Sequence, residues 1–288
     1  MIVPMATAFE KARGKWVRGL PATIARVTTG WSLTVGRPFR TIEEGCAWVA
    51  PATDAKGTLA VLKVSFPHFE EEHEIQGLRF WDGEPTVRLL AADDELHVML
   101  LERCVPGTSL REIPEAEQDA VIAGLLRRMW RRPPAVHPFR SLETMLAHWS
   151  AEAEGSIAHA DDPGLVREGI ELFHSLPCAA TQRVVLATDL HAGNALRSGR
   201  EPWLVIDPKP FLGDPAYDAT QHLLNCGDRL LAQPDQTIKK FAELLEVNAE
   251  RVGLWTFARV AVSSAAVDSS EADWSTHLAR TLRATTSL

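Results

Sequence analysis

The hydrophobic and polar positions of this chain change their period about a third of the way along it. In the first third, short apolar and β-branched runs alternate with turn residues, as is typical of strands. We predict strands at residues 30–35, 47–50, 58–64, 87–92 and 96–101. The last two flank the Asp93-Asp94-Glu95 turn and should form a hairpin.

Two helices are expected beside these strands. Phe9, Ala12, Trp16 and Leu20 recur at helical spacing and predict a short amphipathic helix over residues 6–20. The main helix of this region is predicted over residues 69–81.

From Pro114 onward the pattern is mostly helical. Val121, Leu125 and Met129 share one helix face, and Pro114 suits the first turn. Further helices are predicted at residues 142–158, 165–175, 218–231, 237–246, 249–266 and 271–283. A β-rich segment, residues 183–211, interrupts them with one hairpin. We therefore predict an α+β, bilobal fold with a β-rich N-terminal lobe (1–103) and a mostly helical C-terminal lobe (104–288).

Composition narrows the functional classes. A chain of 288 residues can bury the core of two lobes. The net charge of −8 and the single short basic run, residues 127–132, argue against nucleic-acid binding, and an acidic balance is compatible with a cationic small substrate. The longest apolar runs are much shorter than a membrane span. Scattered cysteines without a CxxC pair predict reduced thiols in the cytoplasm.

The most informative segment contains Asp189 and Asn194, which have the D-L-x-x-x-N spacing of a kinase catalytic loop. The hairpin that follows should bring Asp207 beside Asn194, giving a divalent cation oxygen ligands from two segments. Asp189 would then lie where a hydroxyl approaches the γ-phosphate. As the alternative, Asp and Asn are common turn residues, and this spacing also occurs by chance.

Lys63 and Glu74 supply an independent indication. Lys63 ends an apolar strand that resembles the V-A-I-K strand of kinases, and Glu74 on the next helix could pair with it. In that case Lys63 holds the nucleotide phosphates and Glu74 orients it. The alternative is a solvated lysine, with Glu70, Glu71, Glu72 and Glu74 forming an exposed acidic face.

Residues 100–104 should form a hinge between the lobes. An adenine edge is read there by backbone groups, so Glu102 and Cys104 are candidate nucleotide-binding residues whose side chains carry little information. A Gly-rich phosphate loop is not evident, because residues 41–48 contain only Gly45.

The segment after Asp207 contains further polar candidates. Asp214 should cap the next helix, because Pro215 fits its first turn. Asp218 could support the catalytic loop from behind. Lys209 is either a phosphate contact or a solvent-exposed residue, and the sequence does not decide between them.

Three motifs resemble those of the aminoglycoside/hydroxyurea antibiotic-resistance kinases, close to the streptomycin 6-phosphotransferases. They are Asp189-Leu190-His191-Ala192-Gly193-Asn194, Ile206-Asp207-Pro208 and Gly213-Asp214-Pro215-Ala216-Tyr217-Asp218. The resemblance implies a protein-kinase-like fold that uses ATP, or GTP, with Mg²⁺. It also implies that Asp189 is the catalytic base, that Asn194 and Asp207 hold magnesium, and that Lys63 contacts the nucleotide phosphates.

The chain departs from the family pattern at one point. The usual His-Gly-Asp is Ala187-Thr188-Asp189 here, and that histidine normally braces the catalytic segment. Near the C-terminus, a wall for a cationic guanidinium or ammonium substrate could be formed by Asp268, Glu271, Asp273 and Trp274. The alternative for that segment is an ordinary helix N-terminus.

Three functions are consistent with these residues. The first is an ATP-dependent O-phosphotransferase that acts on an aminoglycoside hydroxyl, with a streptomycin-like acceptor. The second is the same chemistry on hydroxyurea or another small hydroxylated metabolite. The third is a nucleotide-binding pseudokinase, which Ala187 and the absence of a Gly-rich loop favour. The oligomeric state and the choice between ATP and GTP are left open.

Overall fold

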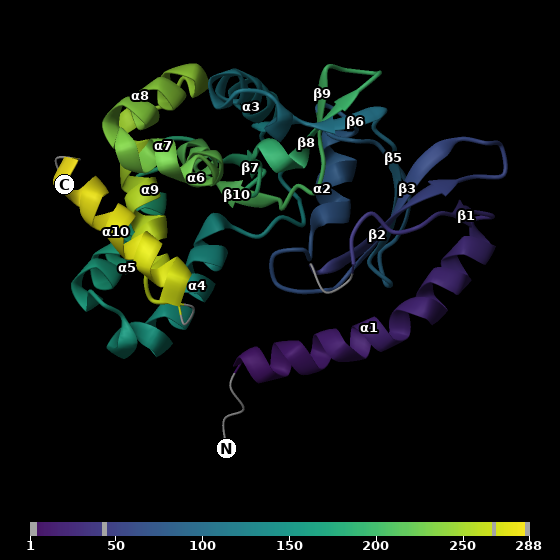
Figure 1. Ribbon diagram of the computed structural model, residues 1–288, viewed down its shortest axis with the longest axis horizontal. Coiled ribbons are helices and arrows are strands. Elements are labelled where there is room, and N and C mark those ends of the chain that lie inside the picture. The colour runs from purple at the N-terminus through teal and green to yellow at the C-terminus, as the bar shows by residue number, and fades with distance from the viewer. Residues whose placement is uncertain (1–4, 42–44, 267–268, 286–288) are drawn as a thin grey trace.

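The computed structural model describes residues 5–41, 45–266 and 269–285 of the chain. Figure 1 shows a β-rich lobe, formed by the N-terminal third, beside a larger and mostly helical lobe. The predicted α+β, bilobal architecture is confirmed. We propose that the boundary between the lobes lies between residues 103 and 104.

The N-terminal lobe is built on a five-stranded antiparallel sheet in the order β1-β2-β3-β5-β4. Its strands are β1 Thr34–Val35, β2 Ala47–Thr53, β3 Leu59–Ser65, β4 Leu89–Asp93 and β5 Val98–Glu102. Side chains alternate between the faces of the central strand β3. Leu62 packs in one apolar cluster and Val61 in another, so Lys63 shares the face of Val61.

Two helices cover the two faces of this sheet. Helix α1, Met5–Gly30, packs Leu20 and Val27 into the cluster that contains Leu62, and Figure 1 shows it running along the sheet. Helix α2, Glu74–Trp81, packs Ile75 and Leu78 on the opposite face. Since α2 begins at Glu74, its first residue lies close to the lysine face of β3.

Both helices differ from the predicted bounds. Helix α1 was predicted to end near residue 20, but it continues through Pro21 because the sheet buries its next apolar turns. The predicted strand at 30–35 is therefore reduced to residues 34–35. Residues 69–73, predicted as helix, form turns.

The C-terminal lobe packs its helices around α9, whose neighbours include α5, α6, α8 and α10. Phe173, Tyr217 and Trp255 are fully buried in its core. The helices are α3 Glu115–Met129, α4 Leu142–Ser156, α5 Pro163–Cys178, α6 Pro215–Asn225, α7 Gly227–Ala232, α8 Pro234–Leu245, α9 Ala249–Ser263 and α10 Ser269–Thr285. Within the described ranges, no helix is both long and apolar enough to cross a bilayer.

One predicted helix of this lobe is wrong. Residues 218–231 belong to two helices, α6 and α7, which meet at Cys226. The backbone of Cys226 leaves the helical conformation there, with φ −104° and ψ 42°. The next residue, Gly227, lies so close to the indole of Trp274 that a Cβ atom would come within 2.7 Å of it.

Two small sheets flank the loops that contain the predicted residues Asp189, Asn194 and Asp207. Strands β6 Pro106–Ser109, β8 Ala195–Ser198 and β9 Trp203–Val205 form one sheet, and β7 Val184–Leu186 pairs with β10 Phe211–Gly213 in the other. The pairing of β8 with β9 confirms the predicted hairpin. As a result, the loop between β7 and β8 lies beside the loop between β9 and β10.

Candidate active site

The hairpin of β8 and β9 places Asn194 and Asp207 next to each other. The N–H of Ile206 donates to the carbonyl of Asn194 at 2.9 Å, and Asp207 follows directly. The side-chain amide of Asn194 donates through Nδ2 to the carbonyl of Asp189 at 2.9 Å, which leaves its Oδ1 out of that bond. Asp207 adopts a left-handed backbone with φ 55°, a conformation that aspartate tolerates better than most residues. The structure thus brings the two predicted metal ligands together.

Lys63 lies between three carboxylates. Its Nζ is 2.6 Å from Oε2 of Glu74, 2.5 Å from Oδ1 of Asp207 and 3.6 Å from Oε2 of Glu71. The side chains of Lys63, Glu71 and Glu74 are at most 6% exposed. The predicted Lys63–Glu74 pair is therefore present, and the alternative of a solvated lysine with an exposed acidic face is wrong for these three residues.

This cluster shifts the pKa values of its members in opposite directions. Burial alone would lower the pKa of Lys63, but Asp207, Glu71 and Glu74 outweigh it and hold that pKa well above its ordinary value. Burial raises the pKa of Glu74 to about 8, against the opposing effect of Lys63. Burial would also raise the pKa of Asp207, yet the neighbouring Lys63 and Lys209 hold it at about 2. Asp207 is therefore ionised throughout the neutral range.

The donor atoms of the cluster suit a hard divalent cation. Oxygen atoms of Glu71, Glu74 and Asp207 lie within 4.8 Å of one another. Glu71 Oε2 and Glu74 Oε1 are buried and have no hydrogen-bond partner. Carboxylate and amide oxygens are the ligands that Mg²⁺ prefers. An ionised Asp207 next to the amide of Asn194 therefore fits magnesium.

Asp189 is held by two donors from the second loop and from helix α6. Lys209 donates through Nζ to Oδ2 of Asp189 at 2.6 Å, and Gln221 donates through Nε2 to Oδ1 at 2.8 Å. Lys209 is only 13% exposed in its side chain, so the solvent-exposed interpretation is wrong. Gln221 lies one turn beyond Asp218, and this spacing was a signal that could have identified it.

The catalytic segment is supported from behind by Asp218, as the sequence suggested. Its carboxylate accepts the N–H groups of Ala187 at 3.0 Å and Thr188 at 2.9 Å, and the indole N–H of Trp130 at 2.9 Å. Asp214 caps α6 by accepting from the N–H of Ala216, which confirms the predicted cap. It also accepts from Arg251 and Trp255, which link the cap to α9.

The hydrogen bonds and ion pair of Glu102 at the hinge lie away from this cluster. Glu102 pairs with Arg200 of the β8–β9 turn at 2.9 Å and accepts from the N–H of Arg88 at 3.0 Å. Cys104 is buried, and burial raises the pKa of its thiol to about 11. Glu102 therefore ties the hinge to the C-terminal hairpin, and the roles of Glu102 and Cys104 toward a nucleotide stay predictions.

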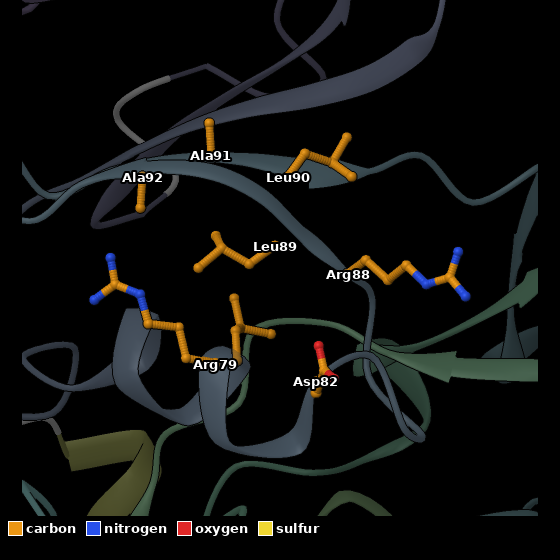
Figure 2. Close-up of a pocket in the computed structure, with 8 residues that line it drawn as sticks. Arg79, Asp82, Arg88, Leu89, Leu90, Ala91 and Ala92 are labelled. Carbon is orange, nitrogen blue, oxygen red and sulfur yellow. The ribbon is translucent and has the colours of Figure 1, made fainter.

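A separate hollow of about 410 Å³ lies between α2 and β4. Figure 2 shows Leu89 pointing into it, with Arg79 and Arg88 at its two ends. Its lining residues are Leu78, Arg79, Asp82, Arg88, Leu89, Leu90, Ala91 and Ala92. None of them is a predicted site residue, so this hollow is distinct from the carboxylate and lysine cluster.

Residues 34–271 match the family described as aminoglycoside/hydroxyurea antibiotic resistance kinase. The chain belongs to this family. Streptomycin 6-kinase of Streptomyces griseus is 32% identical over 269 residues, which cover 89% of this chain and 87% of that protein. Hydroxyurea phosphotransferase of Kitasatospora aureofaciens is 34% identical over 265 residues, covering 90% and 76%.

Solved structures show the same fold at lower identity. Choline kinase LicA from Streptococcus pneumoniae superposes with a TM-score of 0.66 at 13% identity, covering 92% of this chain and 99% of that one. A structure of LicA in complex with AMP gives a TM-score of 0.63. The chain therefore has the protein-kinase-like fold, and family membership implies a nucleotide substrate and a small-molecule acceptor.

This family member braces its catalytic segment without the usual histidine. The methyl group of Ala187 is fully buried, and its N–H is bound by Asp218. Thr188 occupies the glycine position with φ 45°, and its hydroxyl donates to the carbonyl of Lys209 at 2.6 Å. Backbone and threonine hydrogen bonds thus tie the two loops together in this kinase.

Sequence reasoning missed a group of polar side chains that contact one another at His191, two residues after Asp189. Arg111 contacts Oδ1 of Asn225 and Nδ1 of His191 through Nη2, both at 3.2 Å. Burial lowers the pKa of His191, although Asp189 opposes the shift, and its Nδ1 accepts from the N–H of Gly193 at 2.9 Å. These residues come from separate segments, so only the fold brings them together.

The structure describes the side chains of only two of the four residues predicted to form a substrate wall, Asp273 and Trp274. Asp268 lies outside the described residues, and for Glu271 the structure describes the backbone of α10 alone. Asp273 is exposed, whereas Trp274 is half-buried against the core of the C-terminal lobe. The role of all four residues toward a substrate stays a prediction.

Proposed function

We propose that this chain is an ATP-dependent O-phosphotransferase that uses Mg²⁺ and phosphorylates a hydroxyl of a streptomycin-like aminoglycoside. One observation carries the proposal: the fold brings Asp189, Asn194 and Asp207 to the same small volume as the Lys63–Glu74 pair. Phosphoryl transfer depends on positioning and charge stabilisation more than on covalent catalysis, and these residues supply both.

Each residue takes one role in the reaction. The acceptor hydroxyl attacks the γ-phosphorus, its proton passes to the carboxylate of Asp189, and an O–P bond forms. The bond between the γ-phosphorus and the bridging oxygen breaks, and its electron pair leaves with ADP. Asn194 and Asp207 would hold Mg²⁺, which neutralises phosphate charge. Lys63, oriented by Glu74, would exchange Asp207 for the α- and β-phosphates.

The proposed compartment is the cytoplasm, where ATP is abundant. Its support is the set of free cysteines, Cys46, Cys104, Cys178 and Cys226, which a reducing environment maintains. ATP is proposed as the donor, with GTP as the alternative, and a competition experiment with both nucleotides decides between them.

The proposed acceptor class follows from the relatives, which include a streptomycin 6-kinase at 32% identity. Streptomycin carries guanidinium groups, so this acceptor is cationic. A second candidate, hydroxyurea, is favoured by the two donors that contact Asp189, since Lys209 and Gln221 present an ammonium group and an amide rather than carboxylates. A small neutral acceptor would meet no charge repulsion from Lys209.

The deciding experiment incubates the pure protein with Mg²⁺, ATP and either streptomycin, other aminoglycosides or hydroxyurea. ADP release and the mass of the product are measured, with Asp189→Ala as the inactive control. We expect an 80-dalton gain on one acceptor, which is the mass of an added HPO₃ group, and its loss in the variant. Nucleotide binding without transfer to any compound would instead establish a pseudokinase and overturn the proposed activity.

A further inference from the structure

The position of Lys209 points to a part in the chemistry that the motifs do not give it. We propose that Lys209 is a catalytic residue that binds the γ-phosphoryl group during transfer and leaves Asp189 free to accept the proton. This inference rests on the proposed function and deepens it. It concerns the γ-phosphate, the one phosphate of the triphosphate that is not assigned to Lys63.

The ammonium of Lys209 lies between the two sides of the expected reaction. Its Nζ is 2.6 Å from Oδ2 of Asp189, the proposed base, and 3.6 Å from Oδ2 of Asp207, the proposed metal ligand. The transferred phosphoryl group must pass between the base and the metal. A cation between these carboxylates is therefore within reach of its equatorial oxygens.

The backbone fixes this position. The N–H of Lys209 donates to the carbonyl of Ala187 at 3.0 Å, and its carbonyl accepts the hydroxyl of Thr188 at 2.6 Å. Both partners precede Asp189 directly in the catalytic segment. The side chain thus starts from a point tied to the base, and only Nζ has to move when a phosphate arrives.

The carboxyl and ammonium groups around Lys209 support the same role. Glu71, Glu74, Asp189 and Asp207 face two ammonium groups, those of Lys63 and Lys209. With Asp207 engaged as a magnesium ligand, Lys63 would be free to contact the α- and β-phosphates. Lys209 keeps Glu71 at 3.5 Å as a second anchor, so it can leave Asp189 without losing every carboxylate neighbour.

A purely positioning role for Lys209 makes a different prediction. A lysine that only holds Asp189 in place would affect turnover, but it would not sense whether a γ-phosphate is present. A lysine that binds the γ-phosphoryl group would weaken the affinity for a triphosphate and leave the affinity for a diphosphate almost unchanged. Binding measurements therefore separate the two roles without relying on turnover.

The test measures the affinities of Mg²⁺–ADP and of the Mg²⁺ complex of β,γ-imido-ATP by titration calorimetry. Lys209→Gln should weaken the triphosphate analogue by about 10- to 100-fold and ADP by less than about threefold, as expected for one lost charge-assisted hydrogen bond. Lys63→Gln should weaken both nucleotides, and the exposed Lys240→Gln should weaken neither. Lys209→Arg should keep part of the preference for the triphosphate.

The outcomes are distinct. Equal losses for both nucleotides, or no loss for either, would overturn the proposal, provided that Lys209→Gln and Lys209→Arg unfold at wild-type temperatures. Wild-type protein that binds both nucleotides but phosphorylates no acceptor overturns the proposed function, and the affinity comparison still decides the role of Lys209. Wild-type protein that binds neither nucleotide overturns both.

Discussion

Asp218 allows a quantitative test of how the catalytic segment is supported. The substitution Asp218→Asn keeps the size of the side chain but replaces one carboxylate oxygen by an NH₂ group. Oδ2 of Asp218 accepts from Ala187 and Trp130, and Oδ1 accepts from Thr188. The amide oxygen of asparagine can serve the first two donors, so its NH₂ group must face the N–H of Thr188.

Two opposing effects set the magnitude. Losing one hydrogen bond and burying the NH₂ donor against the N–H donor of Thr188 costs about 1–3 kcal/mol of unfolding free energy. Burial raises the pKa of Asp218 from 3.8 to about 6, although the N–H groups of Ala187, Trp130 and Thr188 oppose the shift. That difference makes the ionised carboxylate cost about 3 kcal/mol in the folded state. Asparagine removes this cost.

The sign of the pH dependence follows from these values. Between the unfolded pKa of 3.8 and the folded pKa of about 6, the folded state binds more protons at Asp218 than the unfolded state does. The stabilising contribution of Asp218 is therefore complete below the lower value and is lost as the pH rises through the upper one. The Asp218→Asn variant does not lose unfolding free energy in this way, because asparagine does not titrate.

The assay is urea unfolding of wild type and Asp218→Asn at pH 4.5 and pH 7. We expect the variant to be about 1–3 kcal/mol less stable at pH 4.5, where the carboxyl of folded wild type is mostly protonated, and the difference to move by about 2 kcal/mol in favour of the variant at pH 7. The exposed Asp161→Asn should change stability by less than about 0.5 kcal/mol at both pH values. A gap that stays constant, or widens toward pH 7, would refute the reasoning.

Three further changes test other parts of the structure. Glu74→Gln should weaken Mg²⁺–ATP binding about tenfold by calorimetry, because an amide replaces the carboxyl group that lies 2.6 Å from the ammonium of Lys63 and orients it, whereas Glu72→Gln should leave binding unchanged. Gly169→Ala should lower the unfolding free energy by about 1–3 kcal/mol, because the added Cβ atom would lie 2.9 Å from a side chain of α9. The control Gly124→Ala has open space around it and should raise the unfolding free energy by about 0.5–1 kcal/mol. In native protein, exposed Cys178 should react with a thiol reagent faster than the buried cysteines, and Cys178→Ser should abolish that phase.

The site residues that could be predicted from the sequence are those whose proximity follows from short separations along the chain. Asp189 and Asn194 are separated by one loop, and a short hairpin carries the chain back to Asp207, so their proximity needs little knowledge of the rest of the fold. The pair of Lys63 and Glu74 is similar, because a strand and the next helix face each other across a short connection.

The remaining parts depend on packing between distant segments. Glu71 looked like one of several surface acids, yet it is buried because its loop lies over both lysines. Helix α1 likewise continues beyond residue 20 because the sheet buries its apolar side chains. The break between α6 and α7 at Cys226 lies beside the indole of Trp274, which packs against Gly227. Such contacts leave no periodic signal in the residues themselves.

The placement of α1 has a practical consequence for producing this protein. The family match begins at residue 34, whereas α1 ends at Gly30. A fragment trimmed to the matched span would lose Leu20 and Val27 and would present Leu62 and Leu100 to water. Stripping an apolar β-surface in this way invites self-association. Expression boundaries for this kinase should therefore be chosen upstream of the homologous region, with the first helix retained.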